Sequence, residues 1–168
     1  MKAIKNGIID TTDINMGMVV RFFIIVLVIT AASVAFFKSR ALSDVNLANA
    51  IINEMRNQRD SSGYQSSTDY SASIIKSGAL PSNATVRNNQ IYNQAGQPIQ
   101  IVGNGVGFKL TETGLSDKEC MNLAVKIGSG DMLSTQINGQ TYTAEVTALN
   151  ANTSCSGNNN TITFNTRF

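Results

Sequence analysis

The chain has 168 residues, which is enough for one globular domain and an appendage. Its formal net charge of +2 is too small to indicate a nucleic acid as a partner. It contains no histidine, which excludes Ser-His-Asp and Cys-His catalytic arrangements. The acidic residues are scattered and two thiols do not make a structural zinc site, so we expect neither an enzyme nor a metal or other cofactor.

Residues 1–17 precede the first long apolar run and are interpreted as a leader and a short N-terminal segment. Lys2 and Lys5 suit a start on the cytoplasmic side of a membrane. Asp10 and Asp13 lie close to the beginning of the apolar run.

An apolar helix is predicted next. Between Met16 and Phe37 the only charged residue is Arg21, and about 20 apolar residues suffice to cross a bilayer. The run ends in Phe36-Phe37-Lys38, which is a poor cleavage site, so a secretory signal peptide is disfavoured. We expect its side chains to form the core of an assembly, namely Phe22, Phe23, Ile24, Ile25, Leu27, Val28, Ala31, Ala32, Val34, Phe36 and Phe37.

The helical pattern continues beyond the apolar run. Apolar residues recur at spacings of three and four with polar residues between them: Leu42, Val45, Ala48, Ile52 and Met55. This predicts one helix from about residue 15 to 59, and a segment 18–60 whose second half packs on a globular domain. An ordinary membrane anchor followed by a linker is the alternative, but a linker would not keep helical periodicity over several turns.

Residues 61–168 are predicted to form a globular head domain. A short helix ends at Gly78, and segments 90–93 and 98–102 flank turn residues and form a hairpin. Residues at alternate positions predict a further strand with one buried face: Val106, Phe108 and Leu110.

The second half of the head domain contains stronger local signals. Ser116 and Glu119 form a capping box before a helix that ends at Gly128. Asn138-Gly139 indicates a type I′ hairpin, and residues 161–168 alternate as a last strand. The chain is therefore predicted to be α+β, with a long N-terminal hydrophobic helix and a mainly antiparallel sheet packed on it.

Cys120 and Cys155 are the two cysteines. In an exported domain the expected arrangement is one disulfide, and in the cytosol two free thiols. The membrane segment favours export and hence the disulfide.

The order of elements resembles the type IVb pilins, and in particular the PilS-type subunit of thin conjugative pili. The resemblance rests on GIIDTTD before the apolar helix, LTETGLSDKECMNLAVKIG around the first cysteine and SCSGNNNTITFNTRF at the end. It implies a major pilus subunit that is held in the inner membrane and then polymerises with itself into an extracellular filament. The implied partners are prepilin peptidase, the inner-membrane assembly machinery and a recipient or host cell surface.

The resemblance leaves the processing site open. Gly7 follows a short basic leader, but cleavage there makes Asp10 the third residue and Asp13 the sixth, whereas the family usually has an acid at the fifth. A start at Asn6 places Asp10 fifth but follows a lysine, and cleavage after Gly17 removes both acids. Removal of a leader upstream of this sequence is a further alternative.

Asp10, Asp13 and Arg21 are candidates for setting the register between subunits. Asp13 and Arg21 are eight positions apart, or about 12 Å along a helix, which is too far for a salt bridge within one chain. A neighbouring subunit shifted by that distance would bring its acid to Arg21, and Asp10 would need about 16 Å. Alternatively, Arg21 snorkels to the membrane surface and Asp13 is a first-turn acid favoured by the helix dipole.

Two other functions share this sequence plan. One is a minor pilin or a secretion-system pseudopilin, and the other is a single-span membrane protein with a periplasmic binding domain. Conjugation, attachment and aggregation are all compatible with the polar head.

Overall fold

A single N-terminal helix, α1, spans Thr11–Asn57 in the computed structural model. The structure describes the backbone of residues 11–128 and 131–167, and the side chains of residues 18–28, 44–128 and 131–167. The predicted helix of residues 15–59 is thereby confirmed to within a few residues at each end. The chain divides between Ser39 and Arg40 into two compact units, and we call the second the head unit. The predicted division into 1–17, 18–60 and 61–168 stays a prediction.

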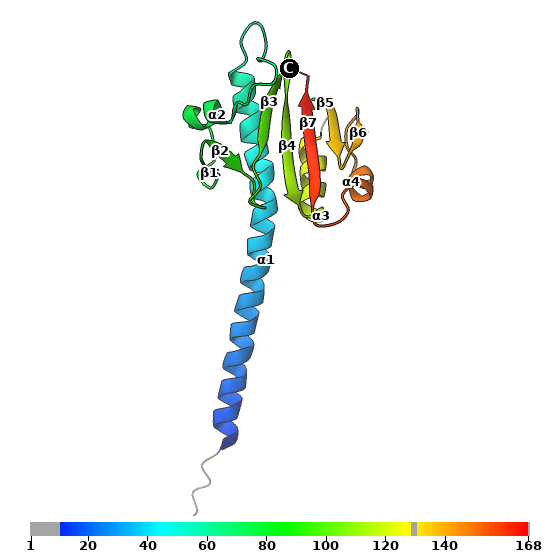
Figure 1. The fold of residues 1–168 in the computed structure, drawn as a ribbon. Helices are drawn as coiled ribbons and strands as arrows, with labels where there is room; N and C mark the ends of the chain where they lie inside the picture. Colours follow the sequence, from blue (N-terminus) through cyan, green and yellow to red (C-terminus); the bar gives the residue numbers. More distant parts are fainter. Residues whose placement is uncertain (1–10, 129–130, 168) are drawn as a thin grey trace, which may run out of the picture. The chain divides into compact units, whose positions relative to one another are not determined.

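The head unit combines the last turns of α1 with three short helices and two antiparallel sheets (Figure 1). After α1 the elements are α2 (Ser71–Ser77), β1 (Thr85–Arg87), β2 (Gln90–Tyr92), β3 (Gln100–Asn104), β4 (Gly107–Leu115), α3 (Asp117–Ile127), β5 (Met132–Ile137), β6 (Gln140–Tyr142), α4 (Ala148–Ser154) and β7 (Asn160–Thr166). Strands β1 and β2 form a small sheet of their own. This arrangement confirms the predicted α+β class.

The main sheet has five strands in the order β3-β4-β7-β5-β6, and every neighbouring pair is antiparallel. The last strand of the chain, β7, therefore lies in the middle of the sheet. In its register with β4, Leu110 faces Phe164 and Glu112 faces Ile162. The register then shifts before Leu115, which marks an irregularity next to Glu112.

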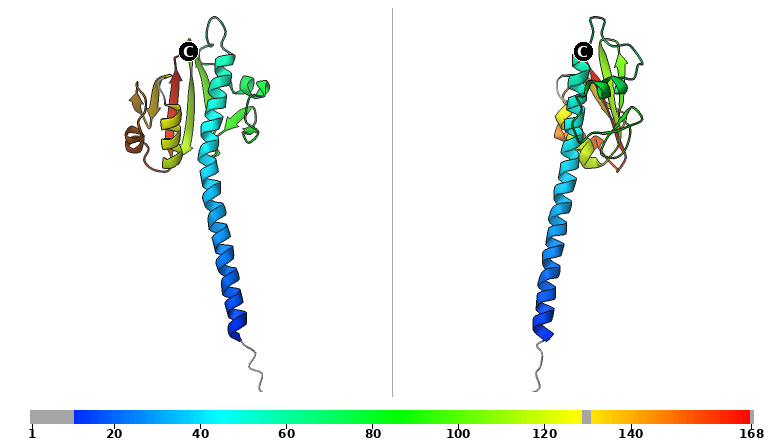
Figure 2. Two further views of the ribbon diagram at one scale, coloured as in Figure 1. Left: turned by 180° about the vertical axis from the view of Figure 1, so that it is seen from behind. Right: turned by 90° about the vertical axis from the view of Figure 1, so that its left-hand side faces the viewer.

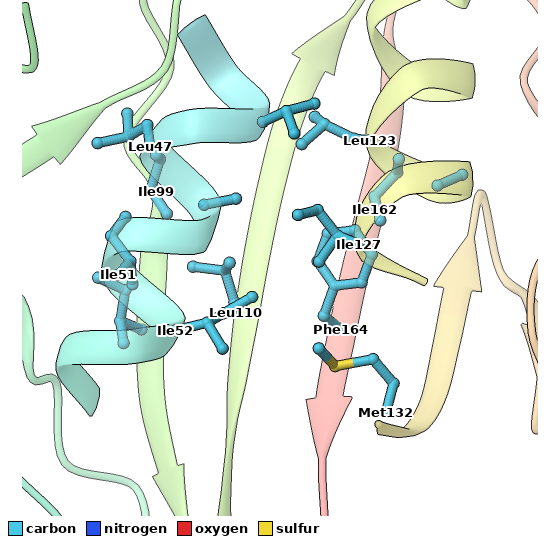
Figure 3. Packing of buried hydrophobic residues seen from close by; sticks show 14 of the residues in the cluster. Leu47, Ile51, Ile52, Ile99, Leu110, Leu123, Ile127, Met132, Ile162 and Phe164 are labelled. Atoms are coloured by element: carbon cyan, nitrogen blue, oxygen red, sulfur yellow. The ribbon is translucent and has the colours of Figure 1, made fainter. Parts of the chain in front are cut away.

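The core of the head unit lies between the sheet and two helices. The C-terminal part of α1 and helix α3 cover the same face of the sheet, as the front and back views show (Figures 1 and 2). Apolar side chains from both helices meet those of the strands in a continuous layer (Figure 3): Leu47, Ile51, Ile52, Ile99, Leu110, Leu123, Ile127, Met132, Ile162 and Phe164. This one layer joins the C-terminal part of α1 to β7, the last strand of the sequence.

The amphipathic pattern predicted for the second half of α1 determines which face enters this core. Val45, Ala48, Ile52 and Met55 are at most 6% exposed, whereas the intervening Asn49 is exposed. Leu42 lies outside the described side chains. The helix end is also fixed from the head, because the hydroxyl of Tyr64 donates to the Met55 carbonyl at 2.8 Å.

Local sequence signals place several turns and helix ends correctly. Helix α2 ends at Gly78, whose φ of 72° is left-handed and suits glycine. Asn138 and Gly139, with φ of 49° and 89°, form the turn between β5 and β6. The capping box at Ser116 and Glu119 begins α3 as predicted.

Three features differ from the sequence prediction. Val106 is 64% exposed and is not part of the predicted strand, because the chain turns at Gly105 between β3 and β4. Segments 90–93 and 98–102 meet in a short antiparallel hairpin, with a bridge between Tyr92 and Pro98 and the Ile99 N–H donating to the Ile91 carbonyl at 2.8 Å, but β2 and β3 have their longer pairings with other strands. Strand β1 and helix α4 were not predicted, since neither segment has strong apolar periodicity.

Candidate assembly site

Helix α1 exposes a dense apolar surface over the side chains described in its first half. Ten of the eleven residues from Met18 to Val28 are apolar and between 51% and 72% exposed, with Val19 the least exposed and Phe22 the most. Arg21 is the remaining residue, and it is exposed as well. Apolar side chains all round a helix are typical of one buried by other molecules or by lipid. This stretch is therefore the candidate assembly site.

No helix among the described residues is both long and apolar enough to cross a membrane. Within the predicted membrane segment, residues 16–37, the structure describes the side chains of Met18 to Val28 alone.

The other predicted residues of the assembly site are placed to different degrees. Gly7 and Asp10 lie outside the described residues. Asp13 belongs to α1, but its side chain is outside the described set. The same holds for the later predicted core residues of the helix, which are Ala31, Ala32, Val34, Phe36 and Phe37. Their roles in assembly and register stay predictions.

A disulfide joins Cys120 to Cys155, the pairing that the sequence predicts. Cys120 lies in the first turns of α3 and Cys155 follows α4 directly, with 5.8 Å between their Cα atoms. Both are buried, at 0% and 4% exposed. The bridge ties the helix packed on the sheet to the segment that leads into β7.

Helix ends with their own caps hold the two cysteines in place. The Ser116 hydroxyl accepts from the Glu119 N–H, and Glu119 Oε2 accepts from the Ser116 N–H at 3.0 Å. Before α4, the Thr147 hydroxyl accepts from the Asn150 N–H at 3.2 Å. Each cap satisfies amides that the first helical turn leaves without partners. The two helices therefore begin at defined residues and bring the cysteines together.

The described residues of the chain contain no group of three or more His, Cys, Asp or Glu placed to hold a metal ion. Two surface hollows lie among the described residues of the head unit. One, of about 450 Å³, is lined by Ile137, Asn138, Gln140, Tyr142, Thr153 and Ser154.

The sequence prediction missed two buried acids in the head unit. Asp44 of α1 and Glu112 of β4 are both 0% exposed. A signal for Glu112 was present, since Phe108 and Leu110 alternate inward and the next inward position is Glu112. Asp44 had no comparable signal, because an acid beside an apolar helix face is ordinarily at the surface.

Comparison with known proteins identifies the family. The family model described as PilS N terminal matches residues 38–167. The fold is similar to that of a type IV b pilin from Salmonella typhi, with a TM-score of 0.59 and 22% identity over 78% of this chain and 99% of that one. It is also similar to TcpA, a type IV pilin from Vibrio cholerae El Tor, with a TM-score of 0.57 and 11% identity over 76% and 98% of the two chains.

No curated protein matches the chain. The family match covers far more than half of the sequence, and the two similar structures have the same fold. The chain therefore belongs to the PilS family, and its fold is that of the type IV pilins.

Proposed function

We propose that this chain is the major structural subunit of a type IVb pilus and polymerises through its N-terminal helix into an extracellular filament. The observation that carries the proposal is the exposed apolar surface of Met18 to Val28 on a chain with a pilin fold. Such a surface is unstable in water and requires burial. Copies of the same helix supply a matching apolar surface.

Burial of this helix in a bundle would make the filament hard to dissociate. A large apolar side chain contributes about 1.5–3 kcal/mol when it is fully buried. Phe22, Phe23 and Leu27 are each at least 68% exposed, so they have most of this stabilisation still to gain. Ala31 and Ala32 follow in the sequence, and small residues let neighbouring helices approach closely.

The same helix would lie in the inner membrane before assembly, with its backbone hydrogen bonds satisfied internally. Prepilin peptidase would process the leader, with Gly7 as the candidate site, and inner-membrane assembly machinery would extract the subunit. Residues 1–17, 18–60 and 61–168 would then act as leader segment, assembly helix and head. This function is structural, and it involves neither an enzymatic reaction nor a cofactor.

The head would form the outer surface of the filament, where it meets a recipient or host cell. Conjugative mating, attachment and aggregation are the functions proposed for that surface. Asp10 and Asp13 would set the register by meeting Arg21 of a neighbouring subunit. A charge at the edge of an apolar bundle is costly unless it is paired, so a subunit would stop where its acid reaches the arginine.

Electron microscopy of cells with and without this protein tests the proposal, with sheared filaments identified by mass spectrometry. A major pilin dominates the sheared material, and its mass gives the mature N-terminus. Filaments of unchanged number in cells that lack the protein would instead indicate a minor pilin or pseudopilin. Absence of any ordered polymer on cross-linking would favour a single-span protein with a periplasmic binding domain.

Deletion of residues 1–38 separates assembly from folding. The core of the head unit is formed by residues from Val45 onward, so the truncated chain should be a folded, soluble monomer. Circular dichroism and sedimentation velocity would measure both properties. Native-like filaments formed by the truncated chain would contradict assembly through the helix.

A further inference from the structure

Glu112 occupies a core position of β4 that the strand's alternation assigns to an apolar side chain. It follows Phe108 and Leu110 on the inward face, pairs with Ile162 of β7 and is 0% exposed. Within the described part of the chain, neither carboxylate oxygen has a hydrogen-bond partner. An ionised carboxylate would lose its hydration here with only a weak interaction with the Asn93 side chain in return, and buried acids avoid that cost by remaining neutral.

Acidic groups from two neighbouring helices act on Glu112. Burial is the largest cause that raises the pKa of Glu112 well above its ordinary value of 4.5, and the charge of Asp44 on α1 is the second. The side chain of Asn93 lowers the pKa by a smaller amount, and Glu119 in the first turn of α3 raises it slightly. Both charged groups that act on Glu112 are thus negative and oppose its ionisation.

The turn of residues 93–97 is attached to the same elements that hold these acids. The Gln94 N–H donates to Asp44 Oδ1 at 2.9 Å. The Asn93 side-chain amide donates to the carbonyl of Thr113, the residue after Glu112, at 2.8 Å. On its outer side the turn helps to line a surface hollow of about 220 Å³ with Thr85, Arg87 and Tyr92.

We propose that Glu112 carries a proton in the folded head unit at neutral pH, and that loss of this proton releases the turn of residues 93–97 as a pH-sensitive switch. Ionised Glu112 would place a second negative charge near Asp44, whose carboxylate holds the Gln94 N–H. Charges repel strongly in a site of low dielectric, and admission of water relieves the repulsion. The turn is the surface segment bonded to both Asp44 and β4, so it is where water would enter.

The direction of the pH effect follows from the raised pKa. Glu112 keeps its proton in the folded state and loses it on unfolding at any pH between its ordinary value near 4.5 and its higher folded value. Its contribution to stability is complete below the ordinary value and is lost as the pH rises through the folded value. Within this window one released proton raises the unfolding equilibrium constant about tenfold per pH unit.

Glu112→Gln provides the main test, because glutamine is a neutral side chain of the same size. Urea unfolding of the full chain in detergent micelles would be followed by near-UV circular dichroism from pH 5 upward. In wild type the unfolding equilibrium constant should rise about tenfold per pH unit. In Glu112→Gln this pH-dependent component should be absent. Glu145→Gln is the matched control, since Glu145 is exposed, and it should behave as wild type. An unchanged slope in Glu112→Gln would overturn the proposal.

Three further measurements do not depend on that variant folding. Carbon-13 NMR of the Glu112 carboxyl group in wild type should show titration far above the ordinary range, and an ordinary titration would refute the protonated state. Hydrogen exchange, corrected for its intrinsic pH dependence, should show loss of protection at Gln94 as the pH rises. Unchanged protection there would refute the switch. If added Ca²⁺ raised the stability of the head unit and a chelator reversed the effect, a bound cation rather than a proton would neutralise Glu112. That result would overturn the proposal.

Discussion

Removal of the Cys120–Cys155 disulfide should destabilise the head unit by about 4 kcal/mol. The bridge closes a loop with a sequence separation of 35 residues. In the chain-entropy model, closing such a loop removes about 13 cal/mol/K from the unfolded state, or about 4 kcal/mol at 25 °C. Both cysteines are almost fully buried, so alanine is a better replacement than serine, which would bury a hydroxyl group.

A double-mutant cycle distinguishes loss of the cross-link from loss of packing. Cys120→Ala and Cys155→Ala each break the same bond, so each should cost about 4 kcal/mol and the double variant little more than either. Urea unfolding followed by tyrosine signals is suitable, because the four tyrosines all lie in the head unit. Reduction of wild type with dithiothreitol should reproduce the shift, and it should leave the double variant unchanged.

Two results would refute this reasoning. If the costs of the single variants added in the double variant, side-chain packing rather than the cross-link would account for them. If each variant lost less than about 1 kcal/mol, the unfolded chain would already hold the two segments close together. Free thiols in the non-reduced, exported protein would show that the bond itself is absent.

Three further predictions concern other parts of the chain. Ser116→Ala removes the capping box of α3 and should cost about 1 kcal/mol in urea unfolding, while a substitution at exposed Asn49 should be neutral. Gly103→Ala should cost about 1–3 kcal/mol in the same assay, because its new Cβ would collide with the carbonyl of Gln65, and an unchanged midpoint would contradict this close approach. Arg21→Ala should leave membrane insertion intact but reduce filament number in electron microscopy, and exchange of the Asp13 and Arg21 charges should partly restore it. Equal, mild effects of all these charge variants would favour snorkelling.

Much of the head could be predicted because its local signals are strong and agree with its packing. The capping box at Ser116, the Asn138-Gly139 turn and the alternation in β7 each depend on a few adjacent residues. The apolar spacing from Val45 to Met55 likewise fixes one face of α1. These features need no knowledge of distant segments, so the sequence is sufficient for them.

The features that could not be predicted depend on tertiary context. Strand β1 and helix α4 are short and mostly polar, and they are positioned by their neighbours rather than by their own periodicity. Val106 has strand propensity, but the turn at Gly105 exposes it. Glu112 is a different case: the alternation of β4 past Leu110 was visible in the sequence and predicts an inward position, but polarity alone assigns such a residue to the surface.

The continuity of α1 bears on the cost of assembly. Residues 18–28 gain little stabilisation from burial in the described chain, since their apolar side chains are more than half exposed. They are nevertheless part of one 47-residue helix whose later turns are held in the head core from Val45 to Met55. Starting a helix is costly, whereas extending an existing one adds a hydrogen bond for each residue fixed. The assembly surface would therefore be helical before it meets a second subunit, which reduces the ordering entropy lost on assembly.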